Sequence, residues 1–177
     1  MKKQIIFSLL AVLVAAGAVA AQRQPSTATK PFVVRSKQSV TDLEKKLAGD
    51  KTDADPKNPT LTKVEDIVAS AGMQTRVAIQ HDHRRSGDMV ELHDRSDDVY
   101  YVIKGQATLE LGGTLVDPKE ASPGEWKAKT VNGAQSVVIR EGDIVFVPRG
   151  TPHRRTVTGK GFSMILIKIF AVDQPVK

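Results

Sequence analysis

The sequence predicts an all-β protein built on a small antiparallel barrel, and two observations support this. From Arg76 onwards, short apolar and β-branched runs alternate with turns that contain Gly, Pro, Asn or Asp. Several short strands at regular spacing are typical of sandwiches and barrels. The second observation is the stretch from Gly142 to His153, where a buried-strand pattern runs into a tight turn. That turn delivers an imidazole at the start of a new strand.

The strand pattern can be followed in order along the chain. Gly112-Gly113 and Glu141-Gly142 each favour a short hairpin turn between neighbouring strands. Residues 117–127 contain Pro and Gly and are expected to form a longer loop. The expected strands begin at Val77 and continue at 89–93, 107–111, 114–116, 136–139, 144–147 and 162–170.

Two short helices are expected before the barrel. Leu43 and Leu47 lie four residues apart within 39–48, a spacing that would place both side chains on the same face of a helix. Thr62 to Glu65 has the spacing of a capping box, and a second helix is expected from there to Gly72. Solvated turns are the alternative for both segments. As helices, they would cover an open face of the barrel.

The first twenty residues have the pattern of a secretory signal peptide. Lys2 and Lys3 precede an apolar run from Ile5 to Val19, and Ala18-Val19-Ala20 offers a cleavage site. A retained anchor helix is the alternative, although the run is short for a bilayer span. The predicted organisation is a signal peptide over 1–20, a flexible leader with a short helix over 21–60, and the barrel domain with its leading helix over 61–177. The expected location is periplasmic or secreted, with no membrane contact after cleavage.

Composition limits the chemistry that the chain can carry. The 177 residues include no cysteine, so disulfides and thiolate ligands are excluded and any metal site must use imidazole and oxygen donors. The chain has 26 basic and 20 acidic residues, a net charge of +6, and loses two lysines with the signal peptide. Aromatic residues make up 5% of the chain. A mild, scattered charge and few aromatics argue against a nucleic-acid partner.

Two stretches of the chain, residues 91–105 and 142–153, resemble the two sequence motifs of the cupin family. The second cupin motif is Gly, five residues, Pro, one residue, Gly, two residues, His, and Gly142, Pro148, Gly150 and His153 match it in full. The first motif is His-x-His, three or four residues, Glu, six residues, Gly. Its positions here are occupied by Glu91, His93, Asp98 and Gly105, with two residue types changed. The resemblance covers roughly residues 76–170 and implies a single-domain cupin barrel.

The resemblance also implies a metal site. In cupins the corresponding side chains hold one divalent metal ion, which assigns Glu91, His93, Asp98 and His153 as candidate ligands. Independently of the resemblance, Glu91 and His93 share a face if they lie on a strand. Two imidazoles with carboxylates suit Fe, Mn, Ni, Zn or Co. Asp98 is shorter than the Glu it replaces and could instead orient a ligand. A metal-free site, with Glu91 paired to an arginine, is the alternative.

Three further groups of residues are candidates of lower specificity. Arg149, near the second motif, is a candidate for recognising an anionic small molecule, and Tyr101 is a second candidate ligand contact. His81 and His83 have the spacing of a ligand pair but are expected at a solvated hairpin tip beside Arg84. A homodimer is a further expectation.

Two functions from different classes remain open at this point. The first is a metal-dependent enzyme of the oxygenase or isomerase type, acting on a small molecule. The second is a non-catalytic module that binds or senses a small ligand, with or without metal. The sequence names no catalytic acid or base outside the ligand set, and a fold does not choose between such functions.

Overall fold

The structure, a computed structural model, describes residues 25–52 and 54–175. The chain divides into two compact units, 1–33 and 34–177. In the first unit, the described residues 25–33 form neither helix nor strand. The signal peptide predicted for 1–20 lies outside the described residues. Within the described part of the chain, no helix has the length and hydropathy needed to cross a bilayer.

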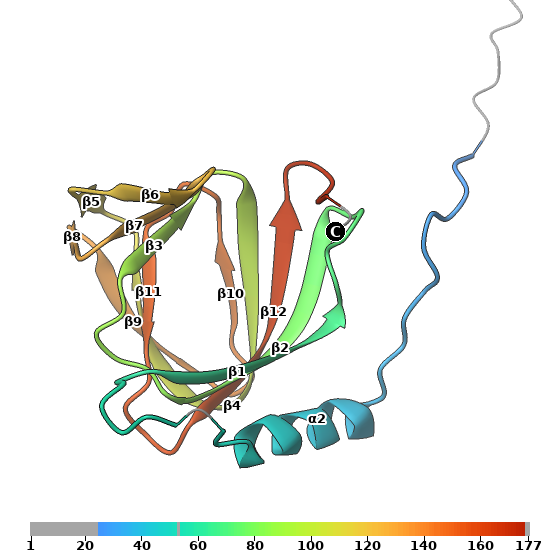
Figure 1. The fold of residues 1–177 in the computed structure, drawn as a ribbon, viewed down its shortest axis with the longest axis horizontal. Coiled ribbons are helices and arrows are strands. Elements are labelled where there is room, and N and C mark those ends of the chain that lie inside the picture. Colours follow the sequence, from blue (N-terminus) through green and yellow to red (C-terminus); the bar gives the residue numbers. More distant parts are fainter. Residues whose placement is uncertain (1–24, 53, 176–177) are drawn as a thin grey trace, which may run out of the picture. The chain divides into compact units, whose positions relative to one another are not determined.

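In the second unit, the described residues form one helix followed by twelve strands of varied length (Figure 1). Helix α2 begins after Ser36, whose side chain accepts a hydrogen bond from the backbone N–H of Ser39 at 3.1 Å. The elements are α2 (Lys37–Gly49), β1 (Leu61–Val68), β2 (Thr75–Arg84), β3 (Val90–His93), β4 (Ser96–Leu111), β5 (Thr114–Val116), β6 (Lys119–Ser122), β7 (Glu125–Ala128), β8 (Thr130–Asn132), β9 (Gln135–Arg140), β10 (Ile144–Val147), β11 (His153–Thr156) and β12 (Phe162–Phe170).

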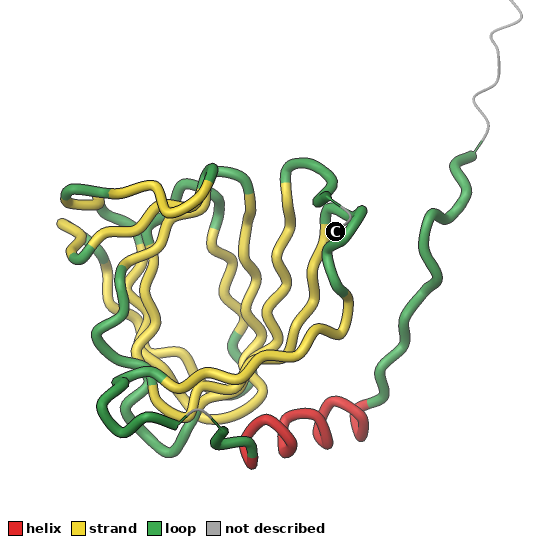
Figure 2. The backbone as a smooth tube through the Cα atoms, viewed as in Figure 1, coloured by secondary structure: helices red, strands yellow, loops and turns green. Residues whose placement is uncertain are grey.

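The all-β prediction is confirmed, but the sheet is open and does not close into a barrel. Ten strands form one antiparallel sheet in the order β1-β2-β12-β4-β11-β3-β7-β6, with β9 and β10 also paired to β4. A separate two-stranded sheet pairs β5 with β8. Because β1 and β6 stand at the two ends of the order and do not pair with each other, the predicted closure is wrong. The strands nevertheless curve around a common interior (Figure 2).

Strand β4 joins the two halves of the sheet. Its first half pairs with β12 and β10, which together with β2 and β1 make the first layer. Its second half pairs with β9 and β11, which continue through β3 and β7 to β6 as the second layer. Gly105 lies between the halves at φ +79°, and a Cβ there would come within 2.3 Å of the Gly161 carbonyl oxygen. Only glycine fits this position.

The core lies between the two layers. A single cluster of buried side chains combines residues from both halves of β4, from β9, β10 and β12, and from the residue just after β11. These residues are Tyr100, Val102, Ala107, Leu109, Ile139, Val147, Val157, Phe162, Met164 and Leu166.

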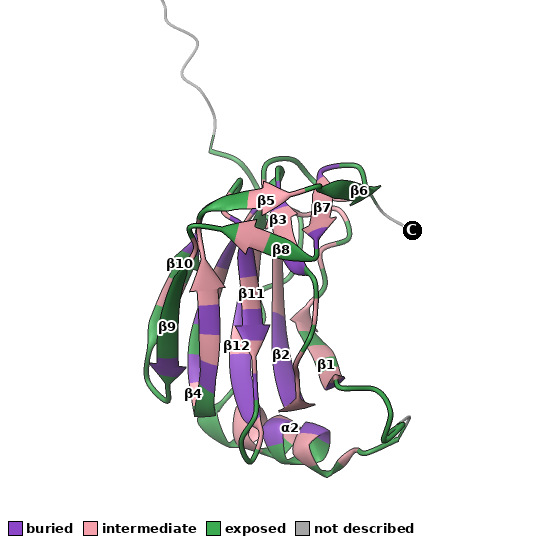
Figure 3. Cartoon of the chain, turned by 90° about the vertical axis from the view of Figure 1, so that its left-hand side faces the viewer, coloured by how far each residue is buried: buried purple, intermediate pink, exposed green. Residues whose placement is uncertain are grey.

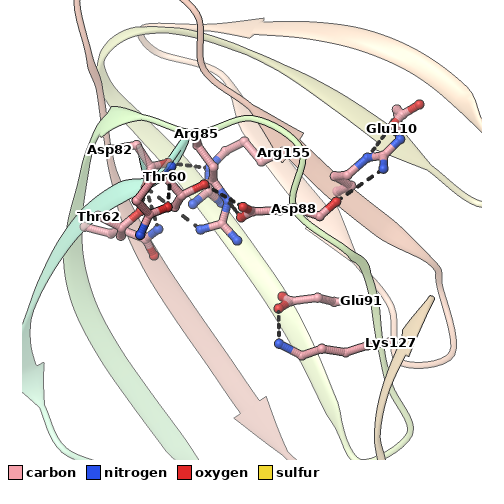
Figure 4. A network of polar contacts seen from close by, with 12 residues as sticks. Thr60, Thr62, Asp82, Arg85, Asp88, Glu91, Glu110, Lys127 and Arg155 are labelled. Atoms are coloured by element: carbon pink, nitrogen blue, oxygen red, sulfur yellow. Dashed lines mark hydrogen bonds and ion pairs between the residues drawn. The ribbon is translucent and has the colours of Figure 1, made fainter. Parts of the chain in front are cut away.

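A buried ion pair links the two layers beside this core. Arg155 on β11 donates from Nε to Asp82 Oδ2 on β2 at 2.8 Å (Figure 4). Asp82 also accepts hydrogen bonds from Thr62 Oγ1 at 2.6 Å and Gln80 Nε2 at 3.0 Å. Burial alone would raise the pKa of Asp82, but Arg155 outweighs it and holds the pKa below its usual value. Arg155 also lies over the rings of Tyr100 and Phe162. The pair therefore fixes β11 against β2.

The prediction of two helices before the sheet is half correct. The first helix, predicted for 39–48, is α2. The second, predicted from Thr62 to Gly72, is wrong, because residues 61–68 form strand β1. The residues of the apparent capping box pair with β2 instead, where Thr62 lies opposite Asp82 and Glu65 opposite Ile79. Pairing with an existing strand edge outweighs a local capping signal.

Two turn predictions are also corrected. Segment 117–127, predicted as a loop, contains β6 and the start of β7, which pair with each other. The expected hairpins at Gly112-Gly113 and Glu141-Gly142 do not pair their flanking strands. β5 pairs with β8, and β9 and β10 lie one after the other along the same side of β4.

The expected hairpin tip at His81 and His83 is wrong as well. Both residues belong to β2, which continues to Arg84. His81 is buried on the face covered by α2, and its Nδ1 lies 2.7 Å from Ser163 Oγ, which donates to Glu44 of the helix at 2.9 Å. His83 Nε2 lies 2.9 Å from the Asp50 carbonyl oxygen. These two imidazoles therefore fasten α2 to the sheet.

We predict that Asp82→Asn lowers the free energy of unfolding at pH 7 by about 3–5 kcal/mol, because it leaves the Arg155 charge buried without its partner. The pKa of Asp82 is lower in the folded chain than in the unfolded one. Its contribution is therefore fully present above the unfolded value of about 4 and is lost as the pH falls through the folded value. Urea unfolding at several pH values measures both effects.

The matched control is Asp66→Asn. Asp66 lies 2.7 Å from Arg76, but both side chains are about one third exposed, so the expected loss is about 0–1 kcal/mol. Equal losses for the two variants at pH 7 would show that the Asp82 pair does not hold the layers together.

Candidate metal centre

Strand β3 carries two of the predicted ligands. Glu91 and His93 are separated by one residue, so both side chains point to the same face of the sheet, into the interior. The register of β3 with β7 sets Lys127 opposite Glu91 and Glu125 opposite His93. Lys127 and Glu91 form an ion pair (Figure 4), in which Nζ lies 3.1 Å from Oε1. Burial would raise the pKa of Glu91, but Lys127 holds it below its usual value.

The third predicted ligand, His153, comes from β11. It is the first residue of the strand and lies directly opposite Glu91 in the pairing with β3. Its Nδ1 donates to the Thr151 carbonyl oxygen at 2.9 Å, which leaves Nε2 without a proton and facing the interior. Burial lowers the pKa of His153 below its ordinary value. The His153 side chain is therefore a neutral imidazole whose unprotonated Nε2 can serve as a metal ligand.

These three side chains converge. One ligand atom each from Glu91, His93 and His153 lies within 4.8 Å of the other two. Donors about 2.0–2.2 Å from one ion lie at most about 4.4 Å apart, which is close to this upper limit. The imidazole rings of His93 and His153 are tilted by 60° with centroids 5.0 Å apart. The group could hold a metal ion, and its oxygen and nitrogen donors suit a divalent transition metal.

A carboxylate that the motif does not include orients His93. Glu125 Oε2 accepts a hydrogen bond from His93 Nδ1, which turns Nε2 of His93 towards Glu91 and His153. A histidine ligand in proteins commonly donates its second N–H to a carboxylate in this way. Glu125 was missed because it lies in the segment predicted as a loop. The sequence signal for a strand here is the alternation of charged and apolar residues in Glu125-Trp126-Lys127, which places Glu125 and Lys127 on one face.

Asp98 lies beside the group but is held by a lysine. Its Oδ2 is 3.6 Å from His93 Nε2 and 4.0 Å from His153 Nε2. Its Oδ1 is 2.9 Å from Lys168 Nζ, because Lys168 on β12 lies opposite Asp98 in the register with β4. The Tyr100 hydroxyl donates to Oδ2 at 3.3 Å, and burial raises the pKa of Tyr100. Asp98 is thus placed between the imidazoles and a buried cation.

The group opens into a small cavity between the two layers. Its volume is about 310 Å³, at the lower end of the range for small-molecule sites. Three basic and three acidic side chains line it together with both imidazoles. The lining residues are Gln80, Arg85, Glu91, His93, Asp98, Tyr100, Glu125, His153, Arg155, Met164, Leu166 and Lys168.

No protein-family model and no curated protein sequence matches the chain. Solved structures do match. A recombinant oxalate oxidase in complex with glycolate is 16% identical, with a TM-score of 0.46 over 68% of this chain and 57% of that chain. KdgF from Halomonas sp. is 18% identical, with a TM-score of 0.45 over 69% and 86%. A cupin superfamily protein from Desulfitobacterium hafniense is 16% identical, with a TM-score of 0.40 over 62% and 78%.

The chain is similar to cupins. The similarity of these structures concerns the fold alone. The present chain spans little more than half of the oxalate oxidase chain. The chemistry of the candidate site therefore depends on its own residues.

The two predicted ligand contacts outside the metal group do not reach the cavity. Arg149 is tied to Asp97 by its backbone N–H at 2.8 Å and its guanidinium at 2.7 Å. Tyr101 is 42% exposed on the outer face of β4, because it is one residue away from the inward-facing Tyr100. Arg155, two residues after His153, lines the cavity instead. Arg155 lies two residues after His153 on β11, so strand alternation places both side chains on the same face.

We predict that the His93 imidazole is protonated on Nδ1, because the Glu125 carboxylate accepts a hydrogen bond from this atom. Nitrogen-15 NMR of histidine-labelled protein, prepared with chelator, measures the tautomer. Glu125→Ala should remove this preference. Glu110→Ala is the control, since Glu110 binds Arg154 on the other face of the second layer. An Nε2-protonated His93 in the unchanged chain would contradict the assignment of Glu125.

Proposed function

We propose that this protein holds a divalent metal ion through Glu91, His93 and His153 and acts on a small molecule as an oxygenase- or isomerase-type enzyme. The observation that carries the proposal is the convergence of these three side chains on one point of the cavity. Two of the donors are imidazole nitrogens, and each ring is oriented by a hydrogen bond from its Nδ1. Such orientation is what a metal site requires.

The surrounding residues support the binding of a small polar molecule. A metal ion held there would act as a Lewis acid towards an oxygen atom of the bound molecule. Met164 and Leu166 form an apolar wall of the cavity, and Arg85 and Arg155 offer guanidinium groups. The Tyr100 hydroxyl stays protonated, because burial raises its pKa, and it can donate a hydrogen bond. An anionic ligand, expected from Arg149, would here have to share Arg85 with Asp88 and Arg155 with Asp82.

One observation favours the second candidate, a metal-free module that binds a small ligand. Two of the three carboxylates beside the imidazoles already have ammonium partners, Lys127 on Glu91 and Lys168 on Asp98. A buried carboxylate without a cation is costly, so these lysines could replace the metal charge. Lys127 is 42% exposed and can turn away to solvent, whereas Lys168 is 14% exposed and stays. The metal is therefore expected to displace Lys127 and not Lys168.

We predict that His93→Ala and His153→Ala each lower bound metal by tenfold or more, because each removes one of two imidazole donors. His83→Ala is the control, since His83 lies on the face towards α2. Elemental analysis of untagged protein measures metal content. Melting temperature with and without chelator should fall on metal removal only where metal binds. Equal metal content in His153→Ala and His83→Ala would exclude this site.

Lys168→Met separates the two candidate functions. In the metal site, it frees the Asp98 carboxylate beside both imidazoles, so metal affinity should rise. In a metal-free module, it leaves Asp98 buried without a cation, so stability should fall and no metal should bind at micromolar concentrations.

We also propose that the chain is exported and cleaved after Ala20, on the basis of its basic start, apolar run and small-residue site. The intact mass of protein from the periplasm or medium should correspond to a chain beginning at Ala21. Recovery of a chain that retains residues 1–20 would contradict the proposal.

A further inference from the structure

The two histidines that the candidate metal centre does not use lie on the face of β2 that α2 covers. His81 is 6% exposed, and Ile79, which shares its face of the strand, is fully buried. Helix α2 packs mainly on β2 and β1. Figure 3 shows the helix outside the strands, with buried and exposed residues along its length. His81 and His83 therefore belong to the contact that holds α2 on the sheet.

The hydrogen bonds of His81 fix its tautomer. Ser163 Oγ donates its one proton to Glu44 Oε1 at 2.9 Å. His81 Nδ1 lies 2.7 Å from the same Ser163 oxygen, so Nδ1 must be the donor in this contact. Nε2 then carries the lone pair and lies against Gly161, where a Cβ would come within 3.2 Å of it. Among the described residues, no hydrogen bond reaches Nε2. The neutral imidazole is therefore satisfied, whereas a proton on Nε2 would face a glycine.

The elements packed around His81 bring charged groups of both signs. Glu44 Oε1 of α2 lies 3.8 Å from His81 Nδ1 and 3.5 Å from Lys104 Nζ of β4. The rings of His81 and His83 have centroids 4.5 Å apart. On β12, the residue opposite His81 is the uncharged Ser163. The charged and titratable groups around His81 are therefore Glu44 on α2, Asp50 at the end of the helix, Lys63 on β1, Asp82 and His83 on β2, and Lys104 on β4.

These surroundings disfavour a second proton on His81. Burial lowers the pKa of His81, and the neighbouring His83 lowers it further. The carboxylates of Glu44 and Asp82 oppose this effect and are outweighed. For His83 the geometry is different, because its Nε2 donates to the Asp50 carbonyl oxygen at 2.9 Å, and a second proton on Nδ1 would leave that bond intact. His81 is thus the histidine of the pair whose protonation conflicts with the docked helix.

Helix α2 can leave the sheet without disturbing the strands. It has 13 residues, and helices of about this length are marginal in water without tertiary contacts. Among the described elements, all strand pairings are made between strands, so none depends on the helix. The ion pair of Lys46 with Glu65 is exposed and contributes little to docking. Local opening of α2 therefore requires less free energy than unfolding of the sheet.

We propose that the chain of hydrogen bonds from His81 through Ser163 to Glu44 is a pH-sensitive latch, which holds α2 on the sheet at neutral pH and releases it in mildly acidic solution. Once α2 has left, His81 lies in water and takes up a proton from the solvent near its ordinary pKa of about 6.5. In the docked chain the pKa of His81 is lower. Docking is therefore fully favoured above about pH 6.5 and is lost as the pH falls through the docked value. Release uncovers Ile79, while the cavity, which Gln80 lines on the other face of β2, keeps its residues.

Hydrogen exchange of the backbone amides, corrected for the pH dependence of the intrinsic rates, tests the latch. Between about pH 7.5 and pH 5.5, protection of the amides in α2 should fall by up to about tenfold, because opening takes up one proton. Amides of β4 and β12 should keep their protection over this range. His81→Asn retains an N–H donor in the place of Nδ1 and does not titrate, so the pH dependence in α2 should disappear. His83→Gln, which retains a donor in the place of Nε2, is the matched control and should keep the pH dependence.

A second measurement needs no substitution. Nitrogen-15 NMR of histidine-labelled protein should show His81 protonated on Nδ1 at neutral pH. The doubly protonated ring should appear only together with the loss of protection in α2. A doubly protonated His81 under a helix that stays protected would overturn the proposal. So would the same pH dependence in His81→Asn as in the unchanged chain, or an equal loss of protection in β4 and β12, which would mean unfolding of the whole sheet.

Discussion

The pairing register of β3 and β4 decides which polar side chains meet in the cavity. On β3, a slip of one residue would turn Glu91 and His93 outward and bring Leu92 in. The register with β7 gives His93 its carboxylate, Glu125, and the register with β11 sets His153 opposite Glu91. On β4, the pairing with β12 gives Asp98 its lysine. The candidate metal centre is thus a consequence of strand pairing, and each ligand depends on a neighbouring strand for its partner.

Charge balance then sets what this cavity can bind. Burying so many ionisable groups is costly unless each has a partner. Arg155 is neutralised by Asp82, Asp98 by Lys168 and Glu91 by Lys127. Of these three pairs, Lys127 on Glu91 has the most exposed cation. A divalent ion bound at the proposed site would therefore replace Lys127 at Glu91 without disturbing the pair that joins the layers. The proposed metal site and the stability of the fold would thus depend on different ion pairs.

Local patterns in the sequence predicted those site residues whose position depends only on their own strand or turn. Period-two alternation put Glu91 and His93 on one face, and the turn at Gly150, with φ +78°, delivered His153 to the start of β11. Residues that act through distant pairing were missed. Glu125 and Lys168 become part of the site only through strands far away in the sequence.

The errors in the fold have the same physical origin. Segment 61–68 has the local signals of a helix start but completes a sheet edge beside β2. The tendency of Glu141-Gly142 to form a hairpin is overridden because β9 and β10 both pair with β4. A sheet that ends at β1 and β6, and does not close, depends on the lengths of all its strands together. No single segment of sequence records that property.

The position of a bound metal tests this account most directly. Crystals of the metal-loaded protein, measured with X-rays tuned to the absorption edge of the metal, locate the ion by anomalous scattering. The account predicts one ion at about 2.0–2.2 Å from Nε2 of His93, Nε2 of His153 and a Glu91 oxygen, with Lys127 displaced and Lys168 still on Asp98. An ion held elsewhere, or a cavity that stays metal-free with Lys127 on Glu91, would contradict it.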